Sequence, residues 1–511
     1  MSDRYDVVVI GSGLGGLSCG ARLSKLGYRV AVFEKHIYPG GYASYFKRKK
    51  YLFDVSLHGI GGLAKGDDLN QILHACGVAD RITPLQKKYP YSFELNNQVY
   101  DVPQNWKEYN LLLCSLFPEE KQGIHKLFED LRKFKKEVAF LYTRDVPQWK
   151  KGMLFPFKCR LLMKWSNKTV QQVLEGYVSS SDFINIFTVL WSYYGLPPKK
   201  LASLYFLIPW LSYHLEGTYY IQGGGQALSK ELTEVIKEHG GEVFLRKEVD
   251  EIIVKEYKEI FNVKSTKGQE VYANWLVSNT SPYLTLKLFK ENFPKELKKF
   301  SKHIDKLTIG TSILQLYLGI KGDPKSVGMN REEIFFVEET DTYTDYQRSI
   351  SGDYQNVNLS ITNYNAMDCT LNEKGRGVIV VTCLDHINNW PEYSLDYREK
   401  KREVTNILLE RVEERYPGLK EKIEVMELGT PRTMLRYTSN PNGAVYGFEQ
   451  TVSQSGIKRL KNQSPLRNLS FVGAWTQPGG GYQGAITSGF LEANRIAKKM
   501  KKHKRKRNGG K

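Results

Sequence analysis

The hydrophobic residues at the start of the chain are grouped as an alternation of strands and a helix requires. A continuous apolar run, residues 6–10, leads directly into a glycine-rich turn. From residue 14 the apolar positions recur at helical spacing, and a second apolar run over 29–33 ends at Glu34. The pattern predicts a strand, a helix and a second strand in this order.

The pattern changes further along the chain. Residues 67–217 contain long amphipathic stretches, for example 119–140, and no clear strand alternation, so this part is expected to be mainly helical. Strand-like runs bounded by turn residues return after it. The expected strands are residues 219–222, 242–245, 248–255, 261–265, 270–273, 313–319, 358–362, 377–382 and 469–475, and residues 275–282 are expected to form a strand that runs into a turn.

These elements predict an α/β fold in which a Rossmann-like nucleotide-binding domain is built from discontinuous segments. An α+β substrate domain is interleaved with these segments. The expected division is nucleotide-binding segments at 1–66, 218–284 and 431–500, a helical insertion at 67–217 that faces substrate or membrane, a substrate domain at 285–430 and a disordered basic tail at 501–511.

The turn after the first strand has the spacing G-x-G-x-x-G, formed by Gly11, Gly13 and Gly16. The first glycine permits the tight turn, the second lets the backbone approach a pyrophosphate, and the third lets the helix pack closely on the strand. The helix N-terminus then directs its free N–H groups at the anion. Glu34 stands at the distance along the chain that is expected for a carboxylate that binds a ribose hydroxyl.

Three further glycine-rich sites occur far apart, at residues 39–41, 223–225 and 478–484. Each is attached to a strand or a helix end, so backbone N–H groups could approach a long, phosphate-bearing ligand at several points. A second glycine-rich unit near the C-terminus favours FAD over NAD, and no separate NAD(P) domain is recognisable.

The amino-acid composition bears on the redox compartment, on metal binding and on the charge of binding partners. The six cysteines form no C-x-x-C pair and the nine histidines form no H-x-H pair, so we expect a reducing compartment and no metal site. The net charge is +19, and nine basic residues lie between Lys498 and Lys511. Without a nucleic-acid-binding signature, this charge favours an anionic membrane surface over nucleic acid.

A second basic segment supports contact with a membrane. Residues 146–174 carry six basic residues and no acidic one, interleaved with bulky apolar side chains such as Trp149 and Phe155. The alternative is a charged amphipathic cap on the substrate domain. The longest apolar stretch, 201–213, is too short to span a bilayer, and no signal peptide is expected. We therefore expect a cytoplasmic, peripherally membrane-associated protein.

Seven motifs together resemble the phytoene desaturase-type flavoproteins of the amine-oxidase-like FAD superfamily, over the whole chain except the basic tail. Residues 57–61 are more similar to the retinol saturase and carotenoid isomerase branch. The seven motifs are residues 9–17, 34–44, 53–58, 223–228, 240–243, 277–282 and 471–481.

The resemblance implies FAD at the bottom of a hydrophobic tunnel, and it assigns thirteen residues to the cofactor. Gly11, Ser12, Gly13 and Gly16 would contact the pyrophosphate, Glu34 and Lys35 the adenosine ribose, Gly41 and Ala43 the diphosphate and ribityl chain, Val249 the adenine edge, and Gly473, Gly481, Tyr482 and Ala485 the ribityl–flavin end. Many members of the superfamily carry an acid where this chain has Ala474, so one carboxylate contact is missing.

The implied reaction is hydride exchange between flavin N5 and a C–C bond of an isoprenoid polyene, as saturation, desaturation or isomerisation. His58 is the candidate catalytic residue, because it could donate a proton to the substrate or polarise a carbonyl group of the flavin. The alternative is that His58 has a purely structural role. The electron partner is open between NAD(P)H, a quinone and a protein. Two other functions compete: amine oxidation, and flavin-free binding of prenylated proteins as in the Rab GDP-dissociation inhibitors.

Overall fold

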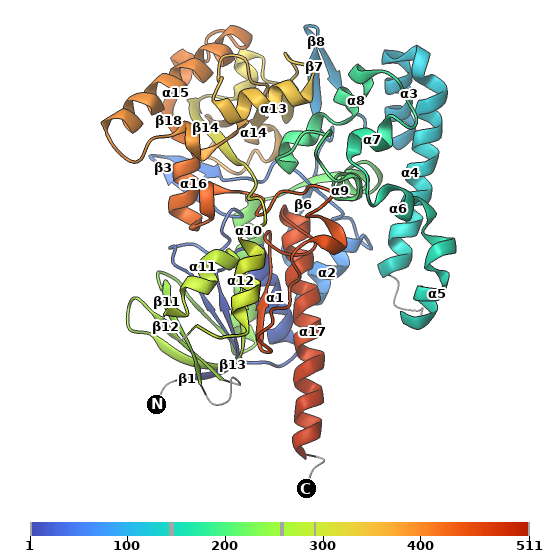
Figure 1. Cartoon of the computed structure of the whole chain (residues 1–511). Helices are drawn as coiled ribbons and strands as arrows, with labels where there is room; N and C mark the ends of the chain where they lie inside the picture. Colours follow the sequence, from blue (N-terminus) through green and yellow to red (C-terminus); the bar gives the residue numbers. More distant parts are fainter. Residues whose placement is uncertain (1–2, 143–147, 256–259, 291–292, 509–511) are drawn as a thin grey trace.

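A computed structural model describes residues 3–142, 148–255, 260–290 and 293–508 of the chain. Two seven-stranded sheets and a helical arm build the molecule (Figure 1). The first sheet lies in the lower half of that view and the second in the upper half. The prediction of an α/β fold assembled from interleaved segments is confirmed.

The first sheet is assembled from three distant segments. Its strands run in the order β10-β2-β1-β13-β12-β11, and β19 pairs with the end of β13. The pairs among β1, β2, β10, β13 and β19 are parallel, whereas β11, β12 and β13 are antiparallel neighbours. The bounds are β1 Asp3–Ile10, β2 Val30–Phe33, β10 Glu242–Phe244, β11 Val249–Lys255, β12 Ile260–Ser265, β13 Glu270–Ser278 and β19 Leu469–Phe471.

Alternate residues of β1 enter two different hydrophobic cores. Val7 and Val9 pack into the core that holds residues of α1, Leu14–Lys25, α2, Asp68–Cys76, α10, Gly224–Glu238, and α17, Tyr482–Asn508. Val8 and Ile10 face the opposite core, which holds residues of α11, Pro282–Lys287, and α12, Leu297–Ile304. The continuous apolar run is therefore explained by a sheet that is covered on both faces.

The second sheet carries the substrate domain. Its strand order is β18-β14-β17-β16-β15-β7-β8, antiparallel except for the parallel pair of β15 and β7. The bounds are β7 Ser92–Leu95, β8 Gln98–Asp101, β14 Ser312–Lys321, β15 Glu333–Phe336, β16 Leu359–Asn363, β17 Arg376–Asp385 and β18 Ile423–Gly429.

The two faces of this sheet differ in polarity. Leu314, Leu316 and Val381 pack into a core together with residues of α15, Leu395–Arg415. The opposite face carries buried polar side chains along the central strands, and it is turned toward the other parts of the molecule. These are Gln315, Tyr317, Ser360 and Thr362, and the partly buried Thr382 lies on the same face.

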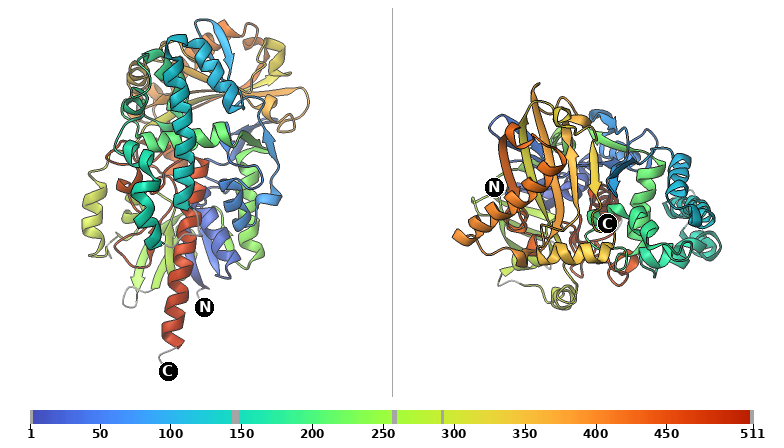
Figure 2. Two further views of the ribbon diagram at one scale, coloured as in Figure 1. Left: turned by 90° about the vertical axis from the view of Figure 1, so that its right-hand side faces the viewer. Right: turned by 90° about the horizontal axis from the view of Figure 1, so that it is seen from above.

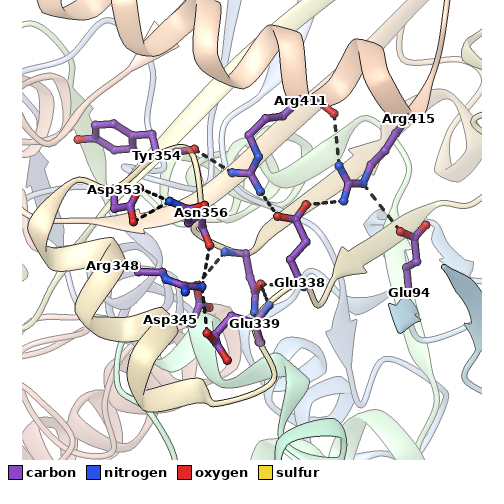
Figure 3. A network of polar contacts seen from close by, with 11 residues as sticks. Glu94, Glu338, Glu339, Asp345, Arg348, Asp353, Tyr354, Asn356, Arg411 and Arg415 are labelled. Atoms are coloured by element: carbon purple, nitrogen blue, oxygen red, sulfur yellow. Dashed lines mark hydrogen bonds and ion pairs between the residues drawn. The ribbon is translucent and has the colours of Figure 1, made fainter. Parts of the chain in front are cut away.

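An ion-pair network fastens α15 to the far edge of the sheet (Figure 3). Arg411 donates to Glu338 at 2.9 Å and to the carbonyl oxygen of Tyr354 at 2.8 Å. Arg415 also pairs with Glu338 and approaches Glu94 of β7 at 3.9 Å. The network joins three segments of distant sequence, so it holds the edge strands in place against α15.

The helical arm lies along one side of the molecule, on the right in Figure 1, and two small sheets complete the fold. The arm contains α3 Trp106–Leu116, α4 Lys121–Tyr142, α5 Gln148–Lys158, α6 Arg160–Trp165, α7 Val170–Leu174, α8 Ser181–Phe187 and α9 Ser203–Leu215. One small sheet pairs β3, Tyr45–Arg48, with β4, Tyr51–Asp54; the other joins β5, Ile60–Gly61, β9, Thr218–Ile221, and β6, Pro84–Gln86. In the described part of the chain, helices are too short or too polar to cross a bilayer.

Three expectations from the sequence differ from the structure. Strands β7 and β8 lie inside the segment that was expected to be helical, and they extend the substrate sheet. Helices α11 and α12 pack against the first sheet, so the substrate domain starts at β14 and not at residue 285. Residues 501–508, which were expected to belong to a disordered tail, continue α17 to Asn508. The C-terminal end of this helix projects beyond the rest of the molecule (Figures 1 and 2).

Candidate functional site

A cavity of about 890 Å³ extends from the carboxyl ends of β1, β2 and β13 to α9 of the helical arm. The sequence motifs that surround it come from all three nucleotide-binding segments. Eleven of the thirteen residues expected at the cofactor line it: Gly11, Gly13, Glu34, Lys35, Gly41, Ala43, Val249, Gly473, Gly481, Tyr482 and Ala485.

The first end of the cavity meets the open N-terminus of α1. Gly13 is the N-cap residue of this helix, no side chain caps it, and its first turn contains no acidic residue. Gly11 has φ +90°, the left-handed region in which glycine is favoured, and its N–H donates to the carbonyl oxygen of Phe33 at 2.8 Å. Uncapped N–H groups and the positive end of the helix dipole make this position suited to a phosphate.

The two remaining predicted residues, Ser12 and Gly16, do not line the cavity but contact residues that do. Ser12 is buried, and both its N–H, at 2.9 Å, and its hydroxyl, at 2.7 Å, donate to the carboxylate of Glu34. The other carboxylate oxygen of Glu34 accepts from the N–H of His36 at 2.8 Å. At Gly16 a Cβ atom would lie 2.2 Å from the carbonyl oxygen of Gly11. Ser12 therefore orients Glu34, and Gly16 permits the close packing of helix and turn.

Asn279 is a cavity residue that was not singled out from the sequence. It follows β13, whose carboxyl end lies beside that of β1. A Cβ atom on Gly13 would lie 2.7 Å from its side-chain nitrogen, and a Cβ on Gly473 would lie 2.5 Å from its side-chain oxygen. The amide thus fills the space between the first and last glycine motifs. The motif at 277–282 was the available signal for it.

A buried cation, Arg459, holds the C-terminal motif that contains Ala474. Arg459 is 2% exposed and donates to the carbonyl oxygens of Ala474 and Thr476, the latter at 2.9 Å. It also donates to the carbonyl oxygen of Phe448 at 3.2 Å. Burial lowers the pKa of Arg459 to about 10, so it stays charged at neutral pH. Backbone carbonyls therefore fix this loop without a carboxylate.

Lys35 and Tyr482 connect distant segments of the chain around the cavity. Lys35 donates to the hydroxyl of Ser439 at 2.6 Å, next to α16, Pro431–Thr438, and burial lowers its pKa. The hydroxyl of Tyr482 lies 3.4 Å from that of Ser56. Burial raises the pKa of Tyr482 well above its ordinary value, so the phenol is neutral.

The second end of the cavity is aromatic and uncharged. Burial raises the pKa of Tyr193, Tyr194 and Tyr213, so these phenols stay protonated. Tyr213 also donates to the carbonyl oxygen of Gly59 at 2.6 Å. Such a wall buries a hydrophobic chain and offers only neutral hydroxyls to it. Further lining residues at this end are Leu190, Tyr205, Pro209, Ile313, Val445 and Tyr446.

His58 lies on this wall beside a buried ion pair. Its Nδ1 is 2.6 Å from the hydroxyl of Thr362 and 3.7 Å from a carboxylate oxygen of Glu333. Lys87 donates to Glu333 at 2.7 Å, and both side chains are 1% exposed. Tyr193 donates to the same carboxylate and its ring stacks on that of His58, with the ring centres 5.5 Å apart.

The charges around His58 oppose one another. Burial lowers the pKa of His58, Glu333 raises it and Lys87 lowers it, and the net shift is downward, so the ring is neutral at pH 7. Burial would raise the pKa of Glu333, but Lys87 and His58 bring it below its ordinary value. A neutral imidazole beside a carboxylate can take up a proton, since the carboxylate stabilises the resulting cation.

The residues present fit FAD. Glycines of separate motifs, among them Gly13, Gly41 and Gly473, line the cavity, and one helix N-terminus is open to an anion. Glu34 directly follows β2, lines the cavity, and accepts from the N–H groups of Ser12 and His36. A long cavity with phosphate-binding features at one end and aromatic walls at the other matches a flavin dinucleotide.

Comparisons with known proteins agree with this geometry. The sequence profile of the family described as flavin containing amine oxidoreductase matches residues 14–497. An all-trans-retinol 13,14-reductase of Danio rerio is 25% identical over 96% of this chain and 86% of that protein. A chloroplastic prolycopene isomerase of Daucus carota is 27% identical over 97% of this chain and 80% of that protein. An oxidoreductase structure from Methanosarcina mazei gives a TM-score of 0.63 at 18% identity, covering 96% of this chain and 99% of that one.

Proposed function

Because this chain belongs to the family of flavin-containing amine oxidoreductases, we propose that it is an FAD-dependent oxidoreductase acting on a carbon–carbon double bond of an isoprenoid polyene. Family membership confirms FAD as its cofactor, and it sets aside the flavin-free alternative. The similarity to a retinol reductase and a prolycopene isomerase supports a polyene substrate.

The observation that carries the proposal is the single cavity that joins a dinucleotide-binding end to an uncharged aromatic end. Bound FAD supplies hydride acceptance and donation at its ring. The glycine turns and Glu34 would hold the dinucleotide, while the tyrosines and aliphatic residues around α9 would align the polyene and exclude water. Burial of apolar surface contributes about 25 cal/mol per Å², so a hydrocarbon chain needs few polar contacts there.

We assign proton handling to His58. Its Nδ1 is occupied by Thr362, so Nε2 is the ring nitrogen that remains for the substrate side of the cavity. Replacement by alanine should keep FAD and fold while turnover falls on the order of 100-fold or more, and His58→Gln should restore little. Loss of flavin would make His58 a structural residue, and near wild-type turnover would assign the proton to another group.

The direct test uses the FAD-loaded protein under anaerobic conditions. All-trans-retinol and a cis-carotenoid are incubated with the oxidised and with the reduced protein, and products are separated by chromatography while the flavin spectrum is followed. NADH, NADPH and a quinone are offered in turn as electron partners. We expect a changed double bond in at least one polyene. Oxidation of putrescine, with both polyenes unchanged, would instead indicate an amine oxidase.

We further propose that the protein contacts an anionic membrane through α5. Met153 is 66% exposed and Phe157 69% exposed on this helix, next to Lys158 and Arg160. Val146 and its neighbours 143–147 lie outside the described residues, as does the side chain of Trp149. Trp165 is buried in the arm, so only part of the predicted segment is available for contact. An amphipathic helix with exposed apolar and basic residues is typical of interfacial binding.

Liposome sedimentation tests this contact. The protein should sediment with anionic vesicles and dissociate at high salt, because each basic residue near the surface contributes about 1 kcal/mol. Met153→Glu combined with Phe157→Glu should weaken binding more than truncation after residue 500. Leu395→Glu, at a 65% exposed position on α15 far from α5 in Figure 1, is the matched control. Equal binding by all variants would make α5 a structural cap.

A further inference from the structure

A smaller chamber of about 80 Å³ adjoins the cavity behind His58. Its other walls come from the second sheet and from residues around α13, Thr342–Ser351. The two spaces have five lining residues in common, so the chamber lies directly beside the cavity. The shared residues are Ser56, His58, Tyr193, Ile313 and Tyr446.

The floor of the chamber is a polar row across three strands. Gln315 of β14 stands opposite Thr382 of β17, and Thr382 stands opposite Ser360 of β16. All three line the chamber. Thr362, two residues along β16 from Ser360, holds His58. The polar row therefore lies one step along the sheet from the proposed proton-handling group, on the same face.

Two polar atoms of this row have no hydrogen-bond partner among the described residues: the side-chain nitrogen of Gln315 and the hydroxyl of Thr382. Gln315 is only 1% exposed, and its side-chain oxygen lies 2.8 Å from the hydroxyl of Tyr317. Buried polar groups are almost always hydrogen-bonded, and a donor without an acceptor is costly. Beside the chamber, these two groups could therefore form hydrogen bonds with a small polar group of a ligand.

The charges around the chamber determine which polar group fits. No lysine or arginine occurs among the described residues that line it, and two carboxylates do. Glu339 pairs with Arg348 at 3.1 Å, and Asp345 accepts from the N–H of Asn358 at 2.8 Å. Figure 3 shows both carboxylates within the network that borders α13. A carboxylate ligand would meet these acids without a counter-charge, whereas a neutral oxygen would not.

We propose that this side chamber binds the uncharged, oxygen-bearing end of the polyene, in the form of a hydroxyl group. This inference rests on the proposed function and specifies its substrate class as a polyene alcohol. The nitrogen of Gln315 would donate to the hydroxyl oxygen, and the hydroxyl would donate to Thr382. The chamber has room for only a few heavy atoms. The oxygen therefore lies a few bonds from the carbons beside His58, which places the reacting double bond near the polar end of the substrate.

Binding to the FAD-loaded protein tests the assignment. The probes are all-trans-retinol, the hydrocarbon in which hydrogen replaces its hydroxyl, and the corresponding carboxylic acid, each titrated by polyene fluorescence. Wild type should bind the alcohol about tenfold more tightly than the hydrocarbon, the effect of two net hydrogen bonds. Gln315→Leu and Thr382→Val should each reduce this preference about threefold, with hydrocarbon affinity unchanged. Thr405→Val, a buried threonine of α15 that lines neither space, is the control.

The outcomes separate this inference from the function on which it rests. Equal affinity of wild type for alcohol and hydrocarbon would overturn the polar subsite while leaving polyene binding intact. So would tightest binding of the acid, or an alcohol preference that persists in the double variant. Failure of all three probes to bind would refute the polyene function itself. FAD content and melting temperature, measured on each variant, establish that the fold is retained.

Discussion

The buried ion pair between Lys87 and Glu333 should be a major local determinant of stability, although the partners are far apart in sequence. Their charged atoms lie 2.7 Å apart and each side chain is 1% exposed. Removing one partner of such a pair leaves a buried charge without compensation, which costs about 3–5 kcal/mol. In Glu333→Gln this charge is the ammonium of Lys87, which also donates to the carbonyl oxygen of His58 at 3.2 Å.

The expected shift in melting temperature follows from the size of the chain. Unfolding entropy is about 2.1 cal/mol/K per residue, so the 511 residues give about 1 kcal/mol/K. Glu333→Gln should therefore lower the melting temperature by about 3–5 °C. The double variant Lys87→Met with Glu333→Gln should recover part of this loss, because it removes both charges.

Differential scanning calorimetry of the FAD-loaded protein measures these shifts. Glu234→Gln is the control, since Glu234 pairs with Lys237 at 2.9 Å while both side chains are 40% or more exposed. An exposed pair contributes less than about 1 kcal/mol, so this variant should melt within 1 °C of wild type by the same conversion. If Glu333→Gln is no less stable than Glu234→Gln, the pair is screened by solvent and the account of a dry environment around His58 is wrong.

Three further predictions concern the same site. Gly13→Glu should purify without flavin, because a Cβ there lies 2.7 Å from the amide nitrogen of Asn279, whereas Gly152→Glu, with no atom within 4 Å of its Cβ, should keep full flavin absorbance. The pKa of His58 is lowered, so its contribution to stability is present above pH 6.5 and is lost as the pH falls; His58→Gln should reduce the drop in melting temperature between pH 7.5 and 5.5, by at most about 1 °C. An unchanged drop would contradict the lowered pKa. Thr362→Val should retain FAD and lose turnover, since Nδ1 of His58 then lacks its partner; full turnover would show that His58 needs no such support.

The nucleotide-binding end of the site could be predicted from the sequence because its signals are local. A strand, a glycine turn, a helix and an acid within 34 residues define one geometry, and the structure places Gly11, Gly13 and Glu34 on one wall. The helical continuation of α17 was not predicted, because a run of basic residues is typical of a solvated end even where the backbone remains helical.

The substrate end could not be predicted, because its groups meet only through long-range pairing. Lys87 and Glu333 are 246 positions apart and come from the loop after β6 and the start of β15. Strand β7 forms a short hairpin with β8 through Asn96 and Asn97, but this local turn does not reveal that β7 pairs in parallel with the distant strand β15. Tyr193 could not be distinguished from the many other aromatic residues of the chain.

One sequence signal for the substrate end was nevertheless present in β14. Its residues alternate between leucines and the polar pair Gln315 and Tyr317, a pattern normally read as a strand with one face in water. In the structure every residue from Ser312 to Ile320 is buried. A sheet face that is both polar and buried needs partners for its polar groups, and Tyr317 finds one in the carbonyl oxygen of Val55 at 3.0 Å. The side-chain nitrogen of Gln315 lies on the same face and has no partner among the described residues. A buried donor without a partner is expected where a ligand binds, and not where a sheet face contacts water.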